Sequence, residues 1–209
     1  MPSVTRKPQA RRQERREQIE RGLLDATERL MAGGVSYTEL SVDKLATEAG
    51  ISRASFYIYF EDKGDLLVRL AGQVFADLAD AGERWWGVAQ RRDPEDARAA
   101  LNGIIAGYRR HQALLVALGE MAGYDPQVGH TYRQILSAIS ARFAAVIERG
   151  QADGSIRREL SATTVASSIT WMVERACQQE LPGRPASHDS ELAEALSQIA
   201  WSALYLEAP

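Results

Sequence analysis

The sequence predicts an all-α protein, in which an N-terminal three-helix unit containing a helix-turn-helix is followed by a larger helical bundle. Apolar residues recur at helical spacing along nearly the whole chain, and no stretch alternates in the way of a β-strand. Serine, aspartate and proline stand where helices are expected to begin, and glycine stands where they are expected to end. These signals agree with one another and with the all-α class.

The composition indicates how large a core the chain can bury and in which cellular compartment we expect it. The chain has 209 residues, of which 45% are hydrophobic, enough to bury one or two small cores. Cys177 is its one cysteine, which excludes an intramolecular disulfide and is expected to be a small buried apolar side chain. We find no apolar leader and no run of roughly 18 apolar residues that would span a membrane. We therefore expect a cytoplasmic protein with no membrane partner.

Charge is distributed unevenly, although the formal net charge is only −3. Within residues 1–16, six residues are basic and one, Glu14, is acidic. A basic segment on an otherwise acidic chain is a local footprint for nucleic acid. We interpret residues 1–10, which include two prolines, as a flexible basic arm that touches DNA. A merely solvated tail is the alternative.

Capping residues mark the elements of the N-terminal part. Ser41 and Ser52 are good N-caps, and Gly50 can take the left-handed conformation that a sharp turn between two helices requires. The DNA-binding domain is expected to cover residues 11–65. Its expected helices are residues 11–32, 42–48 and 53–59, followed by a fourth that begins near Lys63.

The remaining part, residues 66–209, is expected to be a ligand-binding and dimerisation domain. Asp93-Pro94 and Asp125-Pro126 each place a capping acid before a proline at the first helical position. Gly154 is expected to end the helix that Pro126 begins. The later helices are expected over residues 126–152, 161–179 and 189–206.

The segment over residues 41–63 carries the chemistry. Two short helices joined by a glycine turn form a helix-turn-helix, with Val42 and Leu45 packing inward and Phe56 and Phe60 anchoring the second helix. The early residues of such a helix face base edges in the major groove. The candidate DNA-binding residues are Ser41, Ser52, Arg53, Ala54, Ser55, Tyr57, Ile58, Tyr59 and Lys63.

These candidates are expected to divide into two roles. Arg53 can make a bidentate contact with guanine, and the Ser55 hydroxyl can donate or accept. Tyr57, Tyr59 and Lys63 suit phosphate oxygens, which position a protein on double-stranded DNA without reading its sequence.

From Leu45 to Leu67 the pattern A-x-x-A-G-I-S-R-x-S-F-Y-x-Y-F-x-x-K-x-x-L-L resembles the signature of TetR-family regulators. The closing part, with Trp171 to Arg175, a Pro-Gly loop and a last helix ending Trp201 to Tyr205, is similar to the ethionamide-resistance repressor subgroup. The resemblance implies a homodimeric repressor that a small molecule releases from its operator. Ile58 departs from the polar or aromatic residue of many relatives, so the resemblance does not extend to the base read at that position.

Bulky aromatic residues in the larger part are either core or the lining of an apolar pocket. Tryptophan needs a hydrogen-bond partner when buried, and small-molecule sites are mostly apolar with a few polar groups. Gly107 and its neighbouring helical glycines indicate either close helix packing or open space. The candidate residues for a small hydrophobic effector are Asn102, Tyr108, Met121, Phe143, Thr170, Trp171, Glu174 and Trp201, although Glu174 and Arg175 can equally form a salt bridge.

The helices over residues 161–179 and 189–206 are expected to form the homodimer interface. Each carries an apolar stripe, and two such pairs would give a four-helix bundle. The alternative is that the stripes face the protein's own core. The stripe residues are Ile169, Met172 and Ala176 in the first helix, and Leu192, Leu196, Ile199 and Ala203 in the second.

No catalytic or cofactor motif stands out. His111, His130 and His188 are scattered without metal-ligand spacing, and we find no phosphate loop, zinc-protease motif or nucleophile elbow. We expect no catalytic residue, no metal and no cofactor. The alternative function is a helical carrier or enzyme with an apolar pocket and no role on DNA.

Overall fold

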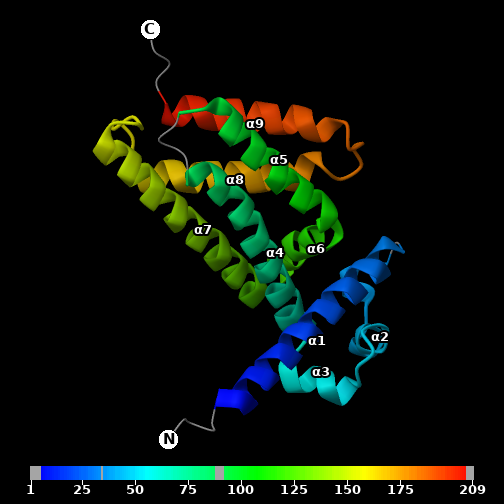
Figure 1. Ribbon diagram of the computed structural model, residues 1–209. Helices are drawn as coiled ribbons and strands as arrows, with labels where there is room; N and C mark the ends of the chain where they lie inside the picture. Colours follow the sequence, from blue (N-terminus) through cyan, green and yellow to red (C-terminus); the bar gives the residue numbers. More distant parts are fainter. Residues whose placement is uncertain (1–5, 34, 88–91, 206–209) are drawn as a thin grey trace, which may run out of the picture.

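The computed structural model describes residues 6–33, 35–87 and 92–205, and these residues contain helices and no strand. The helix-turn-helix elements lie at one end of the molecule, and the longer helices form a bundle at the other (Figure 1). The all-α prediction is therefore confirmed. The elements of the first part are α1 (Arg6–Ala32), the 3-10 turn η1 (Tyr37–Glu39), α2 (Val42–Glu48) and α3 (Arg53–Tyr59).

The beginning of α1 corrects the expectation of a flexible arm over residues 1–10. Residues 6–10 are helical and form the first turns of α1, whereas residues 1–5 lie outside the described residues. Pro8 is the third residue of α1. A proline is tolerated there because the amides of the first turn have no partner within the helix. The proline was therefore not the helix breaker that the sequence suggested.

Helices α2 and α3 have the bounds that the capping serines predict. Helix α2 packs on α1 and on α3, and buried side chains of α1, α2, α3 and the start of α4 belong to one core cluster. Gly50 lies between them with φ +70°, the left-handed conformation that only glycine adopts without strain. The shared core of this part includes Leu23, Leu45, Phe56, Phe60 and Leu66.

Helix α4 (Lys63–Trp86) joins the two parts of the molecule. It begins after the N-cap Asp62, whose carboxylate accepts from the Asp65 amide at 2.9 Å. It then continues through the boundary expected at residue 65 and packs against α5 and α7. The helix-turn-helix unit and the bundle therefore share one continuous helix.

The bundle consists of α5 to α9. Helices α5 and α7 begin at the two expected Asp-Pro pairs, and α7 ends at Gly154 with φ +84°. The sequence did not indicate the break at His111, whose backbone (φ −108°, ψ 22°) separates α5 from α6. The five helices are α5 (Pro94–Arg110), α6 (Gln112–Tyr124), α7 (Pro126–Asp153), α8 (Ala162–Glu180) and α9 (His188–Leu204).

Gly107 allows α5 to approach α4. A Cβ at this position would lie 2.3 Å from Cδ2 of Leu78, a distance that no side chain can occupy. The sequence left two explanations for the helical glycines, close helix packing and open space, and close helix packing applies to Gly107. Because Leu78 also lines the cavity described below, this contact sets one wall of that cavity.

Candidate DNA-binding surface and effector cavity

The two serines at the helix-turn-helix have structural roles. The Ser41 hydroxyl accepts from the Lys44 amide at 3.1 Å, and the Ser52 hydroxyl accepts from the Ser55 amide at 3.0 Å. The Ser52 and Ser55 hydroxyls also lie 2.9 Å apart. Both caps satisfy an otherwise unpaired helix amide. Ser41 and Ser52 remain exposed, so capping does not remove them from the surface.

Helix α3 presents one buried and one open face. Phe56 and Phe60 are buried, as expected, with ring centroids 5.2 Å apart. On the open face Ile58 is 75% and Tyr57 48% exposed. Tyr59 is half-buried, and Arg53 and Ala54 are exposed. The helix therefore offers the N-terminal and outward side chains that a major-groove reader uses.

The Arg53 side chain is exposed and contacts both Asp43 and Tyr57. Its Nη1 lies 2.7 Å from the Asp43 carboxylate, and its guanidinium is 5.6 Å from the centre of the Tyr57 ring. The Arg53 and Asp43 side chains are each 59% exposed. An exposed ion pair contributes little to stability, so Arg53 can exchange Asp43 for a guanine edge at small cost.

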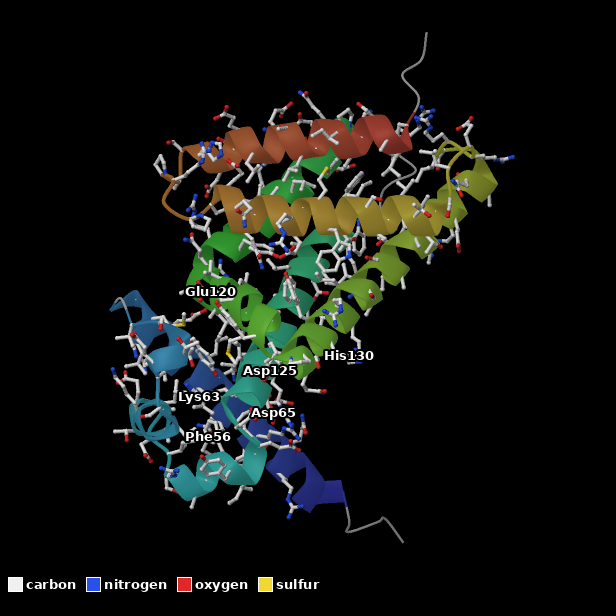
Figure 2. The ribbon with its side chains drawn as sticks, turned by 180° about the vertical axis from the view of Figure 1, so that it is seen from behind. Phe56, Lys63, Asp65, Glu120, Asp125 and His130 are labelled. Atoms are coloured by element: carbon white, nitrogen blue, oxygen red, sulfur yellow. The ribbon has the colours of Figure 1, made fainter. Side chains whose placement is uncertain are left out.

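Lys63 has surroundings that differ from the expectation of a phosphate contact. Its ammonium donates to the backbone carbonyls of Thr38 at 2.9 Å and Leu40 at 2.6 Å, with the Tyr37 carbonyl at 3.5 Å. The Tyr37 hydroxyl donates back to the Lys63 carbonyl at 2.7 Å. All three ammonium donors are thus directed at η1, and Lys63 fastens η1 to the start of α4. Figure 2 shows it near that start, above Phe56.

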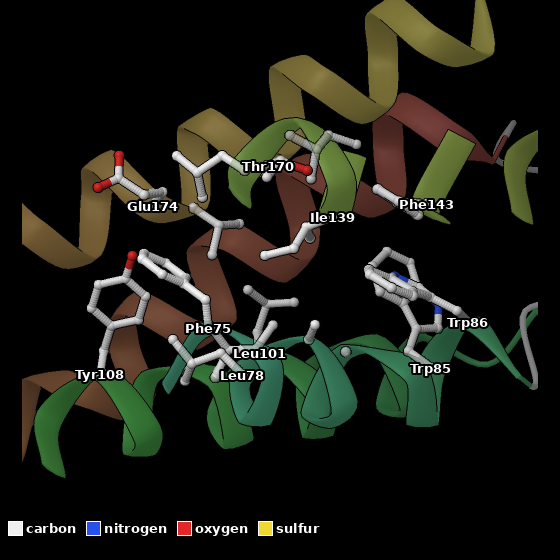
Figure 3. A pocket seen from close by; sticks show the side chains of 16 residues that line it. Phe75, Leu78, Trp85, Trp86, Leu101, Tyr108, Ile139, Phe143, Thr170 and Glu174 are labelled. Atoms are coloured by element: carbon white, nitrogen blue, oxygen red, sulfur yellow. The ribbon is translucent and has the colours of Figure 1, made fainter. Parts of the chain in front are cut away.

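An apolar cavity of about 80 Å³ lies inside the bundle, between α4, α5, α7 and α8 (Figure 3). Pockets for drug-sized ligands are roughly 300–1,000 Å³, so a larger ligand requires the walls to move. The lining residues are Phe75, Leu78, Ala79, Gly82, Trp85, Trp86, Leu101, Ile104, Tyr108, Leu136, Ile139, Phe143, Ile169, Thr170, Val173 and Glu174.

One end of this cavity is aromatic. The Trp86 and Phe143 rings are stacked, with centroids 5.1 Å apart and planes 11° from parallel. Trp85 packs against the same phenylalanine at 5.9 Å. Trp86 also lies over Gly82, where a Cβ would come within 3.2 Å of its ring. The flat faces at this end suit an apolar or aromatic group.

The opposite end is polar and buried. Glu174 is 2% and Tyr108 4% exposed. The Tyr132 hydroxyl donates to Oε1 of Glu174 and accepts from Nε2 of Gln178 at 3.0 Å. Burial raises the pKa of the Glu174 carboxyl, and the Tyr132 hydrogen bond and the Arg175 charge oppose that shift. Burial also raises the pKa of Tyr108, and the nearby Glu174 raises it further.

Four of the eight expected effector residues line this cavity: Tyr108, Phe143, Thr170 and Glu174. The other four lie outside it: Asn102 and Trp171 do not face the cavity from α5 and α8, and Met121 and Trp201 belong to α6 and α9, which contribute no lining residue. Asn102 donates to the Arg98 carbonyl at 3.0 Å, and Trp201 stacks on Tyr205 at 4.0 Å. Trp171 packs edge-on against Tyr132 with ring centroids 6.1 Å apart, and Met121 packs against the core from α6.

The sequence reasoning missed the contribution of α4 to the cavity. Helix α4, which begins in the DNA-binding part, lines the cavity with residues spaced at helical intervals. They include Phe75, Leu78, Gly82, Trp85 and Trp86. Their helical spacing is the available signal, but the same spacing is expected of side chains that pack into a core, and no residue of α4 was among the expected effector residues. Only the packing of α5, α7 and α8 around it leaves a space.

Helices α8 and α9 divide the expected dimer stripes between two faces. Leu192 and Leu196 are buried in α9, which packs on α5, so these two serve the protein's own core. Ile199 is 54% exposed, and Met172 and Ala203 are half-buried. A surface groove between the two helices is lined by Thr164, Val165, Ser168, Ile169, Met172, Ile199 and Ala203.

The single cysteine is buried, and the described residues contain no metal-ligand cluster and no helix suited to crossing a membrane. Cys177 is 1% exposed, and burial raises the pKa of its thiol to about 12, so it is the buried apolar side chain that was expected. Within the described ranges, no three His, Cys, Asp or Glu side chains gather as metal ligands would. None of the helices in those ranges has the length and apolar character needed to cross a bilayer.

An exposed recognition helix after a glycine turn, joined by one helix to a bundle with an internal cavity, defines the class of helix-turn-helix transcriptional regulators. Residues 23–70 match the family described as bacterial regulatory proteins, tetR family. Residues 97–206 match the C-terminal domain of the transcriptional regulator EthR. The chain belongs to the TetR family and is of the EthR-like type.

Relatives with curated descriptions agree with this assignment. The HTH-type transcriptional regulator EthR of Mycolicibacterium smegmatis is 30% identical over 188 residues, covering 87% of this chain and 86% of the relative. EthR of Mycobacterium tuberculosis H37Rv is 27% identical over 171 residues, covering 81% and 79%. The relatives are transcriptional regulators, so the expectation of a regulator rather than an enzyme is confirmed.

Solved structures share the fold at lower identity. A TetR-family regulator from Mesorhizobium loti has a TM-score of 0.70 at 17% identity, covering 92% of this chain and 98% of its own. FadR of Bacillus subtilis, in complex with stearoyl-CoA, has a TM-score of 0.68 at 15% identity, covering 90% and 99%. FadR of Thermus thermophilus, in complex with lauroyl-CoA, has a TM-score of 0.63 at 22% identity, covering 93% and 97%.

Proposed function

We propose that the chain is a homodimeric repressor whose operator affinity falls when an elongated apolar molecule enters the cavity between α4, α5, α7 and α8. The observation that carries this proposal is the shared helix α4, which begins beside the recognition helix and ends as a wall of the cavity. In functional terms residues 11–65 form the DNA-binding domain and residues 66–209 the effector and dimerisation domain.

The open face of α3 supports the DNA-binding half of the proposal. Arg53 reads a guanine, and Ala54, Ser55 and Ile58 contact base edges or thymine methyl groups beside it. Tyr57 and Tyr59 position the helix on phosphate oxygens. Ser41 and Ser52 lie at the N-termini of α2 and α3, where backbone amides also favour phosphate.

The shape and chemistry of the cavity support an apolar effector. Its walls are almost entirely hydrocarbon and aromatic, with Thr170, Glu174 and Tyr108 as the polar groups. Two solved proteins of the same fold hold acyl-CoA molecules, so a bundle of this kind can enclose a long apolar chain. Because the cavity is small, we expect an effector longer than a short hydrocarbon chain to displace the Leu78 or Trp86 side chain of α4.

Displacement of α4 is the proposed route to the DNA. The two recognition helices of a dimer must lie about 34–36 Å apart, one turn of DNA, to enter successive major grooves. Lys63 and Tyr37 tie the start of α4 to η1, so the helix-turn-helix unit follows when α4 moves. An effector that binds the displaced state more tightly shifts the population away from the spacing that DNA requires.

The outward face of α8 and α9 is the proposed dimer interface. Ile199, Met172 and Ala203 leave an apolar groove open to solvent, and two such grooves related by a two-fold axis would cover each other. Packing of two helices from each subunit gives a four-helix bundle. The stripe that includes Leu192 and Leu196 is not part of this interface, because α5 already covers it.

A DNA-binding titration tests the proposed function. Fluorescence anisotropy is measured with duplexes from the upstream region of the protein's own gene, at two salt concentrations, with and without a hydrophobic compound library. We expect selective binding that weakens as salt rises, and at least one compound that lowers operator affinity five-fold or more. Salt-dependent binding to every duplex alike, with no compound effect, would contradict the proposal.

A further inference from the structure

The polar end of the cavity contains a carboxylate oxygen that the protein does not use. Oε1 of Glu174 accepts from the Tyr132 hydroxyl, but Oε2 has no hydrogen-bond partner among the described residues, although the side chain is only 2% exposed. The Tyr108 hydroxyl, 4% exposed, also lacks one there. Burying such groups without partners is costly, so they indicate an occupant that supplies hydrogen-bond donors.

The hydrogen bonds around Glu174 run in one direction. The Gln178 amide donates to the Tyr132 oxygen, which leaves the Tyr132 proton for Glu174. Both hydrogen bonds run toward the carboxyl group, so the described residues supply a donor to Oε1 and none to Oε2. The charge of Arg175 is a weak partner, because its Nε lies 4.0 Å from Oε2 and its side chain is 58% exposed. A buried carboxyl group thus lies at one end of an apolar cavity, with one oxygen unpaired and no close counterion in the described part of the chain. A cationic donor there would supply both the hydrogen bond and the countercharge.

We propose that the effector is a cationic amphiphile, with an apolar or aromatic tail toward Trp86 and Phe143 and a protonated amine that donates to Oε2 of Glu174 and to the Tyr108 oxygen. This proposal rests on the proposed function, since it names the ligand class of the same cavity. Figure 3 shows Glu174 and Tyr108 at one end and the aromatic cluster at the other, so a single elongated molecule reaches both. Thr170, whose hydroxyl donates to the Ala166 carbonyl at 2.8 Å, keeps lone pairs for a further donor.

The same geometry disfavours an anionic head group. A free fatty-acid carboxylate at this end would meet Glu174 in a region of low dielectric, where like charges repel strongly. A neutral alcohol can donate to Oε2, but it supplies no countercharge. Affinity is therefore expected to rank amine above alcohol above carboxylate for one common tail.

Binding of octylamine, octanol and octanoate at pH 7 tests this ranking. Calorimetry and tryptophan emission are used on the full-length protein, because Trp85 and Trp86 line the cavity. We expect octylamine to bind at least ten-fold more tightly than octanol, and octanoate to bind most weakly. Equal affinities for the three, or tighter binding of octanoate, would overturn the amine proposal and leave the apolar cavity as an effector site. No binding of any of them, nor of any compound in the wider library, would overturn both.

Variants separate recognition of the charge from recognition of the tail. Glu174→Gln keeps an acceptor for Tyr132 but removes the charge, and it should weaken octylamine binding more than ten-fold while changing octanol binding less than three-fold. Tyr108→Phe should weaken octylamine binding and leaves the Glu174 network intact should the first variant fold poorly. Glu180→Gln, on the same helix and outside the cavity, is the matched control. Unchanged octylamine affinity in both cavity variants would refute the role of this polar end.

Discussion

At the scale of single residues, surroundings give two basic side chains of the helix-turn-helix region opposite roles. Arg53 and Lys63 both fall in the segment whose sequence pattern indicates DNA binding. Arg53 stands exposed with one replaceable partner, Asp43, whereas the Lys63 ammonium is directed at three backbone carbonyls of η1. A charge can contact DNA only when its present partners are weaker than the phosphate or base that replaces them. We therefore expect substitution of Arg53 to affect DNA binding and substitution of Lys63 to affect stability.

Arg53→Ala should lower affinity for the preferred operator by roughly 1–3 kcal/mol and relax discrimination at one base pair, because a bidentate contact with guanine is lost. Anisotropy titrations against a set of single-base operator variants measure both effects. Asp43→Asn is the control, since it removes the ion pair but keeps the arginine. Loss of affinity in Asp43→Asn equal to that in Arg53→Ala would mean that Arg53 acts only by organising α2 and α3.

Lys63→Met should destabilise the folded protein by about 1–3 kcal/mol, because carbonyls of η1 lose their donor. Urea denaturation measures this loss. The slope of log affinity against log salt should stay unchanged, whereas removal of a phosphate contact would lower it by about one unit. Lys44→Met, at an exposed lysine of α2, controls for the loss of a positive charge. A reduced slope with normal stability would return Lys63 to the phosphate role.

At the scale of elements, α9 shows how one helix can serve two surfaces. Leu196 and Ile199 are three residues apart, and both belong to an apolar stripe in the sequence. Leu196 is 4% exposed and faces the bundle, whereas Ile199 is 54% exposed and borders the groove shared with α8. The stripe is wider than the contact with α5 requires, so the remaining part is free for a second subunit.

Ile199→Glu should convert a dimer into folded monomers, because a carboxylate in an apolar two-fold interface would be desolvated twice. Light scattering coupled to size exclusion measures the mass, and circular dichroism checks the fold. Ile58→Glu, at the exposed isoleucine of α3, should remain dimeric. Leu196→Glu should unfold the monomer itself, so it cannot report on association. A stable dimer of Ile199→Glu would place the interface elsewhere.

At the scale of the whole molecule, two connections join the DNA-binding part to the bundle. The first is α4, which begins at the helix-turn-helix unit and lines the cavity. The second is α6, which contacts both α1 and η1 and at whose N-terminal end His111 is hydrogen-bonded to Glu28. Because both connections respond to the position of the bundle helices, effector and operator binding are expected to be coupled. By linkage the coupling must be equal in both directions.

Glu28→Gln should weaken this coupling while leaving effector affinity in the absence of DNA unchanged, because the contact of Glu28 with His111 lies between the two parts and outside the cavity. Effector affinity is measured with and without operator in the wild type and the variant. We expect a difference of about 5–150-fold in the wild type and a smaller one in the variant. Glu48→Gln, which breaks an ion pair with Arg29 within the DNA-binding part, is the control. Identical coupling in the wild type and both variants would show that the Glu28 contact takes no part in the coupling.

The sequence by itself determined the helix order, most helix ends and the family. Ser41, Ser52, Asp93 and Asp125 cap the helices that they were expected to cap, since capping acts within three or four residues and needs no distant partner. The TetR signature was readable for the same reason: its residues are close in sequence because they build one compact local unit. The break at His111 escaped prediction, because it carries no proline, glycine or capping side chain.

Only the tertiary structure decided which apolar face meets the core, the cavity or solvent. Helical period makes Leu196 and Ile199, or Phe143 and Trp201, equivalent in the sequence, and the packing of neighbouring helices distinguishes them. The same holds for polar groups: Lys63 gained carbonyl partners from η1, some 25 residues earlier, and the cavity enclosed Glu174 with an oxygen left unpaired. Burial and pairing depend on contacts between residues far apart in the chain, and local sequence signals do not specify those contacts.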